Sequence, residues 1–191
     1  MLPTSMPDSL LLNAVLCALL LGAARSDIRS LRIPNRLVFY GAATGLLFNC
    51  MLPAAPGFWQ ALAGLGMGLA IMLPLYLMRA IGAGDVKLMA MVGAWLGANA
   101  MPGVACSTFI LGGVLTLMVA VRNRTLPRLL ANLRNMLLTI FFKMTMHEMP
   151  TLDAGLPVSA GKMPYGVAIA AGAVTYLVLA AAGYMELFQL F

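Results

Sequence analysis

Two of the six acidic residues in this chain, Asp27 and Asp85, lie where apolar segments meet turns marked by glycine or proline. Asp85 ends the stretch Gly82-Ala83-Gly84-Asp85, and Asp27 precedes the turn at Pro34. A charged side chain at the centre of a membrane helix costs about 2.5–3.5 kcal/mol on insertion scales, so an acid near membrane depth indicates a functional site. The glycines indicate the same, because they let the backbone turn where a side chain would obstruct it.

Two carboxylates brought together have a defined chemistry. They cannot both ionise cheaply, so the pKa of one rises and the pair holds one proton. The ionised member can activate water while the protonated member donates to a substrate carbonyl, as in an aspartic-protease dyad. A helix dipole favours an anion at a helix start, which suggests Asp85 as base and Asp27 as acid. The positive charges of Arg25 and Arg29 instead favour the ionised form of Asp27. Which acid serves as base and which as acid therefore stays open.

The elements that must position these acids are apolar. Of the 191 residues, 62% are hydrophobic and 9% are charged, and the mean hydropathy is +0.94. A soluble domain carries about 25% charged residues. Alternation with the period of a strand is absent, which argues against an outer-membrane barrel. We therefore expect an all-α, polytopic membrane helix bundle that forms one domain over residues 1–191.

Six apolar segments predict transmembrane helices at about 10–25, 37–52, 59–79, 83–98, 104–121 and 165–184. Between the last two, apolar residues recur at helical spacing with polar residues on the other side, which predicts an amphipathic interfacial helix at about 127–147. A seventh span is the alternative there, but it would bury Arg134 and Lys143. Small residues four positions apart predict close helix contacts: Gly41 with Gly45, Gly64 with Gly68, and Gly93 with Gly97.

The 12 basic residues lie in three clusters that flank apolar segments: Arg25 to Arg36, Arg79 with Lys87, and Arg122 to Lys162. This is the positive-inside pattern of cytoplasmic loops, and it argues against a nucleic-acid partner. Both termini are then expected on the outer side of the membrane. The first apolar segment is expected to be a retained helix rather than a signal peptide, because its positive charges follow it. Asp27 and Asp85 then share one depth at the cytoplasmic side, within reach if their helices are neighbours.

Each acid also has a purely structural interpretation. Asp27 alone would be an interfacial acid paired with Arg25 or Arg29. Asp85 alone would be the N-cap of its helix, accepting bonds from free backbone N–H groups, with Lys87 extending to the interface. The occurrence of both acids at one depth, each beside a turn, favours a functional site over these interpretations.

With these residues in place, the sequence resembles the type IV prepilin peptidases, which are polytopic aspartic proteases of the GxGD type. Three stretches carry the resemblance: Asp27 with Arg32-Ile33-Pro34-Asn35, Gly82-Ala83-Gly84-Asp85 with Val86-Lys87, and Met163-Pro164-Tyr165-Gly166. The resemblance implies an endopeptidase of the bacterial inner membrane that removes the leader of type IV prepilin or pseudopilin precursors at the cytoplasmic face. It implies Asp27 and Asp85 as the catalytic pair. It also implies a set of supporting motif residues: Pro34, Asn35, Gly82, Gly84, Lys87, Pro164, Tyr165 and Gly166.

The chain departs from the larger members of that family, which carry a cytoplasmic insert with paired CxxC zinc motifs and N-methylate the trimmed pilin. Here Cys17, Cys50 and Cys106 each stand alone in or near an apolar run, which predicts small buried side chains rather than a metal site. The chain thus resembles the short Tad/Flp-type form. We expect no cofactor, no metal and no N-methyltransferase activity.

Two other functions stay open at this point. A GxGD protease of the presenilin or signal-peptide-peptidase kind cuts inside a substrate's span and carries its first aspartate within a span, whereas Asp27 follows one. A small proton-coupled transporter or assembly subunit would use the acids as a proton relay. The strongly basic loops do not match the basic leader of a prepilin, and anionic membrane lipid is the partner that they fit.

Overall fold

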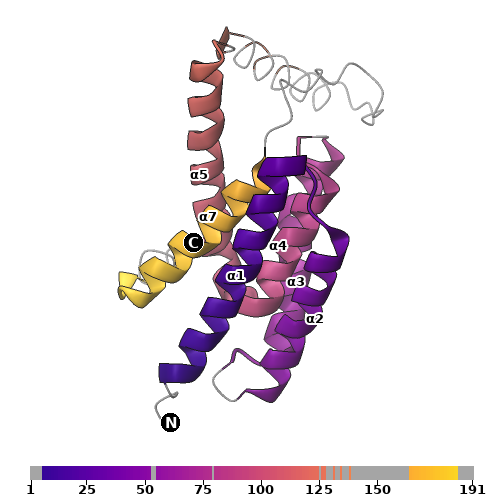
Figure 1. Ribbon diagram of the computed structural model, residues 1–191, viewed down its shortest axis with the longest axis vertical. Coiled ribbons are helices and arrows are strands. Elements are labelled where there is room, and N and C mark those ends of the chain that lie inside the picture. Colours follow the sequence, from indigo (N-terminus) through magenta and orange to yellow (C-terminus); the bar gives the residue numbers. More distant parts are fainter. Residues whose placement is uncertain are drawn as a thin grey trace.

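The computed structural model describes residues 6–52, 55–78, 80–124 and 164–184, with a few single positions between 126 and 138. In these ranges the chain forms helices and no strand (Figure 1). The helices are Met6–Ser30 (α1), Asn35–Met51 (α2), Phe58–Leu77 (α3), Ala83–Leu96 (α4), Ala98–Ala100 (η1), Met101–Arg122 (α5) and Tyr165–Ala181 (α7). The expected all-α class is confirmed for this part of the chain. The predicted interfacial helix at 127–147 lies outside the described residues, apart from single positions.

The short helix α4 is the centre of the bundle. It packs against α1, α2, α3 and α7, and every residue from Val86 to Trp95 except Lys87 is buried. A helix of 14 residues is about 21 Å long, which is less than the ~30 Å hydrocarbon thickness of a bilayer. Because other helices surround it, α4 is the element against which the rest of the bundle is positioned.

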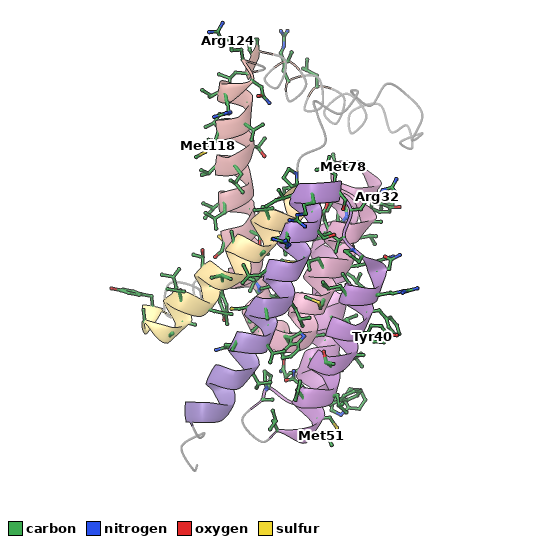
Figure 2. All side chains as sticks on the ribbon, viewed as in Figure 1. Arg32, Tyr40, Met51, Met78, Met118 and Arg124 are labelled. Atoms are coloured by element: carbon green, nitrogen blue, oxygen red, sulfur yellow. The ribbon has the colours of Figure 1, made fainter. Side chains whose placement is uncertain are left out.

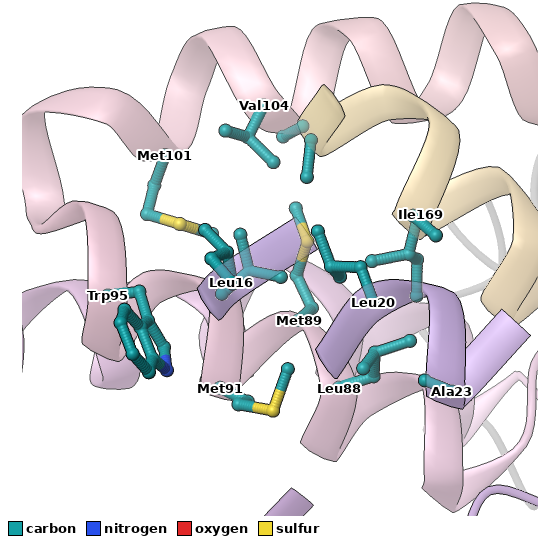
Figure 3. Close-up of a cluster of buried hydrophobic side chains, with 14 of the residues drawn as sticks. Leu16, Leu20, Ala23, Leu88, Met89, Met91, Trp95, Met101, Val104 and Ile169 are labelled. Atoms are coloured by element: carbon teal, nitrogen blue, oxygen red, sulfur yellow. The ribbon is translucent and has the colours of Figure 1, made fainter. Parts of the chain in front are cut away.

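The buried apolar side chains form one cluster around α4 (Figure 3). Its fully buried members include Leu16 and Leu20 of α1, Met72 of α3, Leu88, Met89 and Met91 of α4, Val104 of α5 and Ile169 of α7. Methionine is unbranched and flexible, so it fills irregular gaps between such side chains. The cluster attaches α1 and α7 to α4, and α1 and α4 carry the two acids singled out by the sequence.

The predicted glycine contacts are confirmed in α2, α3 and α4. A Cβ atom added to Gly64 of α3 would overlap the backbone of Gly93 in α4, and one added to Gly68 would overlap the α4 backbone one turn nearer its start. On α2, a Cβ at Gly45 would lie 2.7 Å from Cδ1 of Trp95. These glycines are therefore required by the space between the helices.

Replacing Gly64 by alanine is expected to force α3 away from α4 and to lower the free energy of unfolding by about 1–3 kcal/mol, the usual cost of overpacking. Gly66 lies on the same helix, and a Cβ there would meet nothing within 4 Å. Gly66→Ala is therefore the matched control, and it should leave stability unchanged or raise it. Thermal unfolding of the two purified variants measures the difference, and an equal loss in both would contradict this packing.

Two side-chain hydrogen bonds fix α2 to α4. The indole Nε1 of Trp95 donates to the carbonyl oxygen of Gly41 at 2.7 Å, and Nδ2 of Asn49 donates to the carbonyl oxygen of Ala94 at 3.0 Å. Both side chains are buried, and an unsatisfied polar group in such a place costs about 1–3 kcal/mol. The two bonds therefore hold α4 in one register against α2.

The site lies at the end of the bundle where α1 ends and where α4 and α7 begin (Figure 1). Figure 2 places Arg32, Met78 and Arg124 toward this end and Met51 toward the opposite end. Within the described ranges, α3 and the segment Ala98–Arg122 are the two stretches long and apolar enough to cross a membrane. Helix α1 extends beyond the predicted span 10–25, so Asp27 lies in its last turn.

Candidate active site

Asp27 is held by the start of α7. Its side chain is 5% exposed, and its Oδ2 accepts a hydrogen bond of 2.8 Å from the backbone N–H of Gly166. The N–H of Val167 bonds the same carboxylate. The first N–H groups of a helix have no partner inside the helix, and they lie at the positive end of its dipole. Asp27 therefore has backbone donors as partners, which replaces the pairing with Arg25 or Arg29 considered from the sequence.

Asp27 lies beyond the predicted span of its helix, and its burial raises the pKa of the carboxyl group above the ordinary value of 3.8. The N–H groups of Gly166 and Val167 oppose that shift, because they favour the ionised form.

A pH dependence of stability follows from this raised pKa. An acid whose pKa is higher in the folded state stabilises the fold fully below its unfolded pKa. That contribution is lost as the pH rises from about 3.8 through the raised value. Asp27→Asn has no such titration, so its melting temperature relative to wild type is expected to rise over this pH window. Melting curves of both proteins at several pH values measure this, and a constant difference would contradict it.

Asp85 is held by the turn that starts its own helix. Its side chain is 8% exposed, and its Oδ2 accepts a hydrogen bond of 3.0 Å from the backbone N–H of Gly82. Gly82 is the N-cap of α4. The alternative that Asp85 is itself the N-cap is therefore wrong: it is the third residue of α4, and its carboxylate reaches back to the cap.

The carboxylates of Asp27 and Asp85 interact electrostatically. Helices α1 and α4 are in contact, and the carboxylate of Asp27 is near enough to Asp85 to interact with it electrostatically. Asp85 interacts in the same way with the phenol of Tyr165, the first residue of α7. The three stretches that carried the family resemblance thus meet at one end of the bundle.

The helix dipoles do not separate the roles of the two acids. The sequence placed Asp85 at a helix start and Asp27 at a helix end, which made Asp85 the preferred anion. In the structure Asp27 also faces a helix start, because the first N–H groups of α7 bond it. The sequence argument could not include α7, which begins 138 positions after Asp27.

Ile33 is a site residue that the sequence argument did not single out. Its Cβ would lie 3.3 Å from a Cβ added to Gly84, and its Cδ1 would lie 2.9 Å from a Cβ added to Gly166. The Ile33 side chain therefore sits between the first turns of α4 and α7. The signal that points to it is an apolar residue between Arg32 and Pro34, in the turn that follows Asp27.

The glycines of the Asp85 turn provide space rather than an unusual backbone conformation. Among the described glycines, a positive φ occurs only at Gly57, Gly97 and Gly183. Gly84 is needed because Ile33 packs against it. Gly166 at the start of α7 also leaves no room for a side chain, since a Cβ there would lie 2.8 Å from Oδ2 of Asp27. At Gly84 this agrees with the expectation that a side chain would obstruct the turn.

The remaining motif residues connect the same elements. Nζ of Lys87 donates to Oδ1 of Asn35 at 3.0 Å, which joins α4 to the first residue of α2. Pro34 and Pro164 are the N-caps of α2 and α7, where the missing N–H of proline costs nothing. Tyr165 packs on α5, because a Cβ at Gly112 would lie 3.1 Å from its hydroxyl oxygen.

Comparison with known proteins identifies the family. Residues 14–117 match the model of the type IV leader peptidase family, and this range contains both Asp27 and Asp85. The chain is also 33% identical over 120 residues to a prepilin leader peptidase/N-methyltransferase of Dickeya chrysanthemi. That alignment covers 59% of this chain and 42% of the relative. No solved structure matches. The chain therefore belongs to the type IV leader peptidase family.

Proposed function

We propose that this protein is a membrane-embedded aspartic endopeptidase that removes the leader peptide from type IV prepilin or pseudopilin precursors at the cytoplasmic membrane face. The observation that carries the proposal is the meeting of two buried carboxylates, Asp27 and Asp85, at the end of the bundle where α4 and α7 begin. Membership of the type IV leader peptidase family supports the same class of reaction.

The proposed dyad works by sharing one proton. The ionised carboxylate takes a proton from water, and the water oxygen attacks the scissile carbonyl carbon while the protonated carboxyl donates its proton to the carbonyl oxygen. Collapse of the tetrahedral intermediate breaks the C–N bond: the first carboxyl group gives its proton to the leaving amine, and the second carboxylate takes a proton from one hydroxyl of the intermediate, which restores the shared proton. Asp27 and Asp85 each accept a backbone N–H at a helix start. Either can therefore serve as the base, and the pair titrates as a unit.

We further propose that residues 1–191 form one domain with six spans in the bacterial inner membrane, both termini outside, and an interfacial helix at 127–147 on the cytoplasmic side. Exposed apolar side chains on the outer surface support this embedding, among them Phe39, Tyr40, Ile110 and Met118. Large exposed apolar patches are rare on soluble monomers. The basic residues near the two acids support a cytoplasmic position for the site.

The proposed substrate matches this placement. A prepilin has a basic leader before an apolar helix, so the bond to be cut lies at the membrane surface. Asp27 in the last turn of α1 and Asp85 in the first turn of α4 would lie at that depth, which favours leader removal over cleavage within a span. We propose cleavage without N-methylation, because the 191 residues hold no CxxC pair.

Co-expression with a candidate prepilin, in a host without its own leader peptidase, tests the function. We expect an immunoblot to detect the shorter pilin, and mass spectrometry to find an unmethylated new N-terminus. A precursor that stays uncut, together with a proton flux in proteoliposomes that depends on Asp85, would favour the transporter instead.

Ile33→Ala is expected to lower kcat for leader cleavage by about 10²-fold, because a shift of about 1 Å in a catalytic geometry has effects of that size. We propose Ile33 as a positioning residue, so KM should stay near the wild-type value. Ile33→Val keeps the Cβ branch against Gly84 and should recover most of the rate. Ile28→Ala, at a side chain that is 64% exposed, is the control. A rise in KM with kcat unchanged would contradict a positioning role.

A further inference from the structure

A groove opens between α2 and α3 over the first half of α4. Its volume is about 520 Å³, within the range of about 300–1,000 Å³ that is usual for ligand sites. Lys87 and Ala90 of α4 lie at its base, between the first two turns of α2 and Leu65 and Leu69 of α3. Figure 2 shows Tyr40, which also lines the groove, projecting outward from α2.

The groove has a basic end and an apolar body. Arg36 and Lys87 lie at the end where α2 and α4 begin, and the lining contains no acidic side chain. Lys87 uses one of its three donors on Asn35 and keeps two for a ligand. Away from this end, the walls carry the apolar side chains of Val38, Ala42, Leu65 and Leu69.

The length of the groove corresponds to part of one membrane leaflet. From Asn35 to Ala42 the helix α2 rises about 10 Å, whereas half of the hydrocarbon core is about 15 Å thick. In the orientation proposed above, the basic end lies at the cytoplasmic surface and the apolar body extends toward the bilayer centre. This is the distribution of charge and apolar surface that complements a phospholipid with an anionic headgroup.

We propose that this groove binds one anionic glycerophospholipid of the cytoplasmic leaflet, with its phosphate at Arg36 and Lys87 and an acyl chain between α2 and α3. The proposal rests on the membrane placement proposed above but not on peptide cleavage. The apolar helix of a prepilin is the competing occupant. The basic leader that precedes such a helix would meet two like charges at Arg36 and Lys87, which disfavours that occupant.

Native mass spectrometry of the purified full chain tests the proposal, with dioleoyl phosphatidylglycerol and dioleoyl phosphatidylcholine as probes in neutral detergent. We expect the anionic lipid to bind more tightly. Arg36→Gln should weaken its binding about fivefold, as expected for one cation at a membrane surface. Ala42→Trp fills the groove and should weaken the binding of both lipids at least tenfold. Leu69→Phe, on the opposite wall, should also weaken the binding of both lipids.

Arg124→Gln and Val114→Trp are the controls, because Val114 lies on α5 and Arg124 in the turn that follows it, and both residues are exposed and outside the groove lining. They should leave lipid binding unchanged. Equal affinity for the two lipids in the wild type, or full binding in both Ala42→Trp and Leu69→Phe, would overturn the proposal. Prepilin cleavage is measured on the same preparations. Loss of cleavage with intact lipid binding in Ala42→Trp would assign the groove to the substrate, whereas loss of lipid binding alone supports the lipid.

Discussion

Asparagine at position 85 is expected to lower the rate of prepilin cleavage by about 10⁴-fold, the size of effect seen when one member of a catalytic unit is removed. An amide can neither take the proton from water nor share one with Asp27. Its carbonyl oxygen can still accept the hydrogen bond that the N–H of Gly82 donates to Oδ2 of Asp85. The fold should therefore survive while the chemistry is lost.

The measurement is the rate of leader removal from a purified prepilin, together with the melting temperature of the variant. Asp85→Glu is the informative companion, because it keeps the carboxyl group but moves it by one methylene group. We expect it to retain more activity than Asp85→Asn. A variant Asp85→Asn that cleaves at the wild-type rate would exclude Asp85 from the chemistry, and an unfolded variant would show that its role is structural.

Gly166→Ala has the second-largest expected effect, a loss of about 10²-fold in cleavage rate. The new Cβ would lie 2.8 Å from Oδ2 of Asp27 and 2.9 Å from Cδ1 of Ile33. Either Asp27 moves or α7 shifts, and both changes alter the relation of Asp27 to Asp85. The rate should therefore fall more steeply than the stability does.

Gly113→Ala is the matched control, because a Cβ at Gly113 in α5 meets nothing within 4 Å. It should leave both cleavage and the melting temperature near their wild-type values. Comparing the two variants separates the effect of local crowding from the general effect of alanine in a helix. Full activity in Gly166→Ala would contradict the contact between the start of α7 and Asp27.

Charge and hydropathy were sufficient to predict much of the arrangement. The clusters of Lys and Arg placed Asp27 and Asp85 on one side of the bundle, and the structure has α1 ending where α4 begins. The small residues at four-residue spacing predicted close contacts, and Gly64 lies against Gly93. Both signals are local patterns whose meaning does not depend on which helices are neighbours.

What the sequence could not provide were contacts between distant segments. The partner of Asp27 is the N–H of Gly166, 139 positions away, and a backbone donor has no signature in the residue type. By residue type, Ile33 is an ordinary turn residue. Its importance follows only from its packing against Gly84 and Gly166, which the structure shows. The dipole argument for the two roles was incomplete for the same reason, because it omitted the start of α7.

The most direct test of the central claim compares four proteins in proteoliposomes: wild type, Asp27→Asn, Asp85→Asn and the double variant. If the two aspartates form one catalytic unit, each single substitution should lower the rate of leader cleavage about as much as the double substitution does. Folding of each variant is checked by its melting temperature. A single variant that keeps more than about 1% of the wild-type rate, or a double variant whose loss is the product of the two single losses, would contradict the dyad.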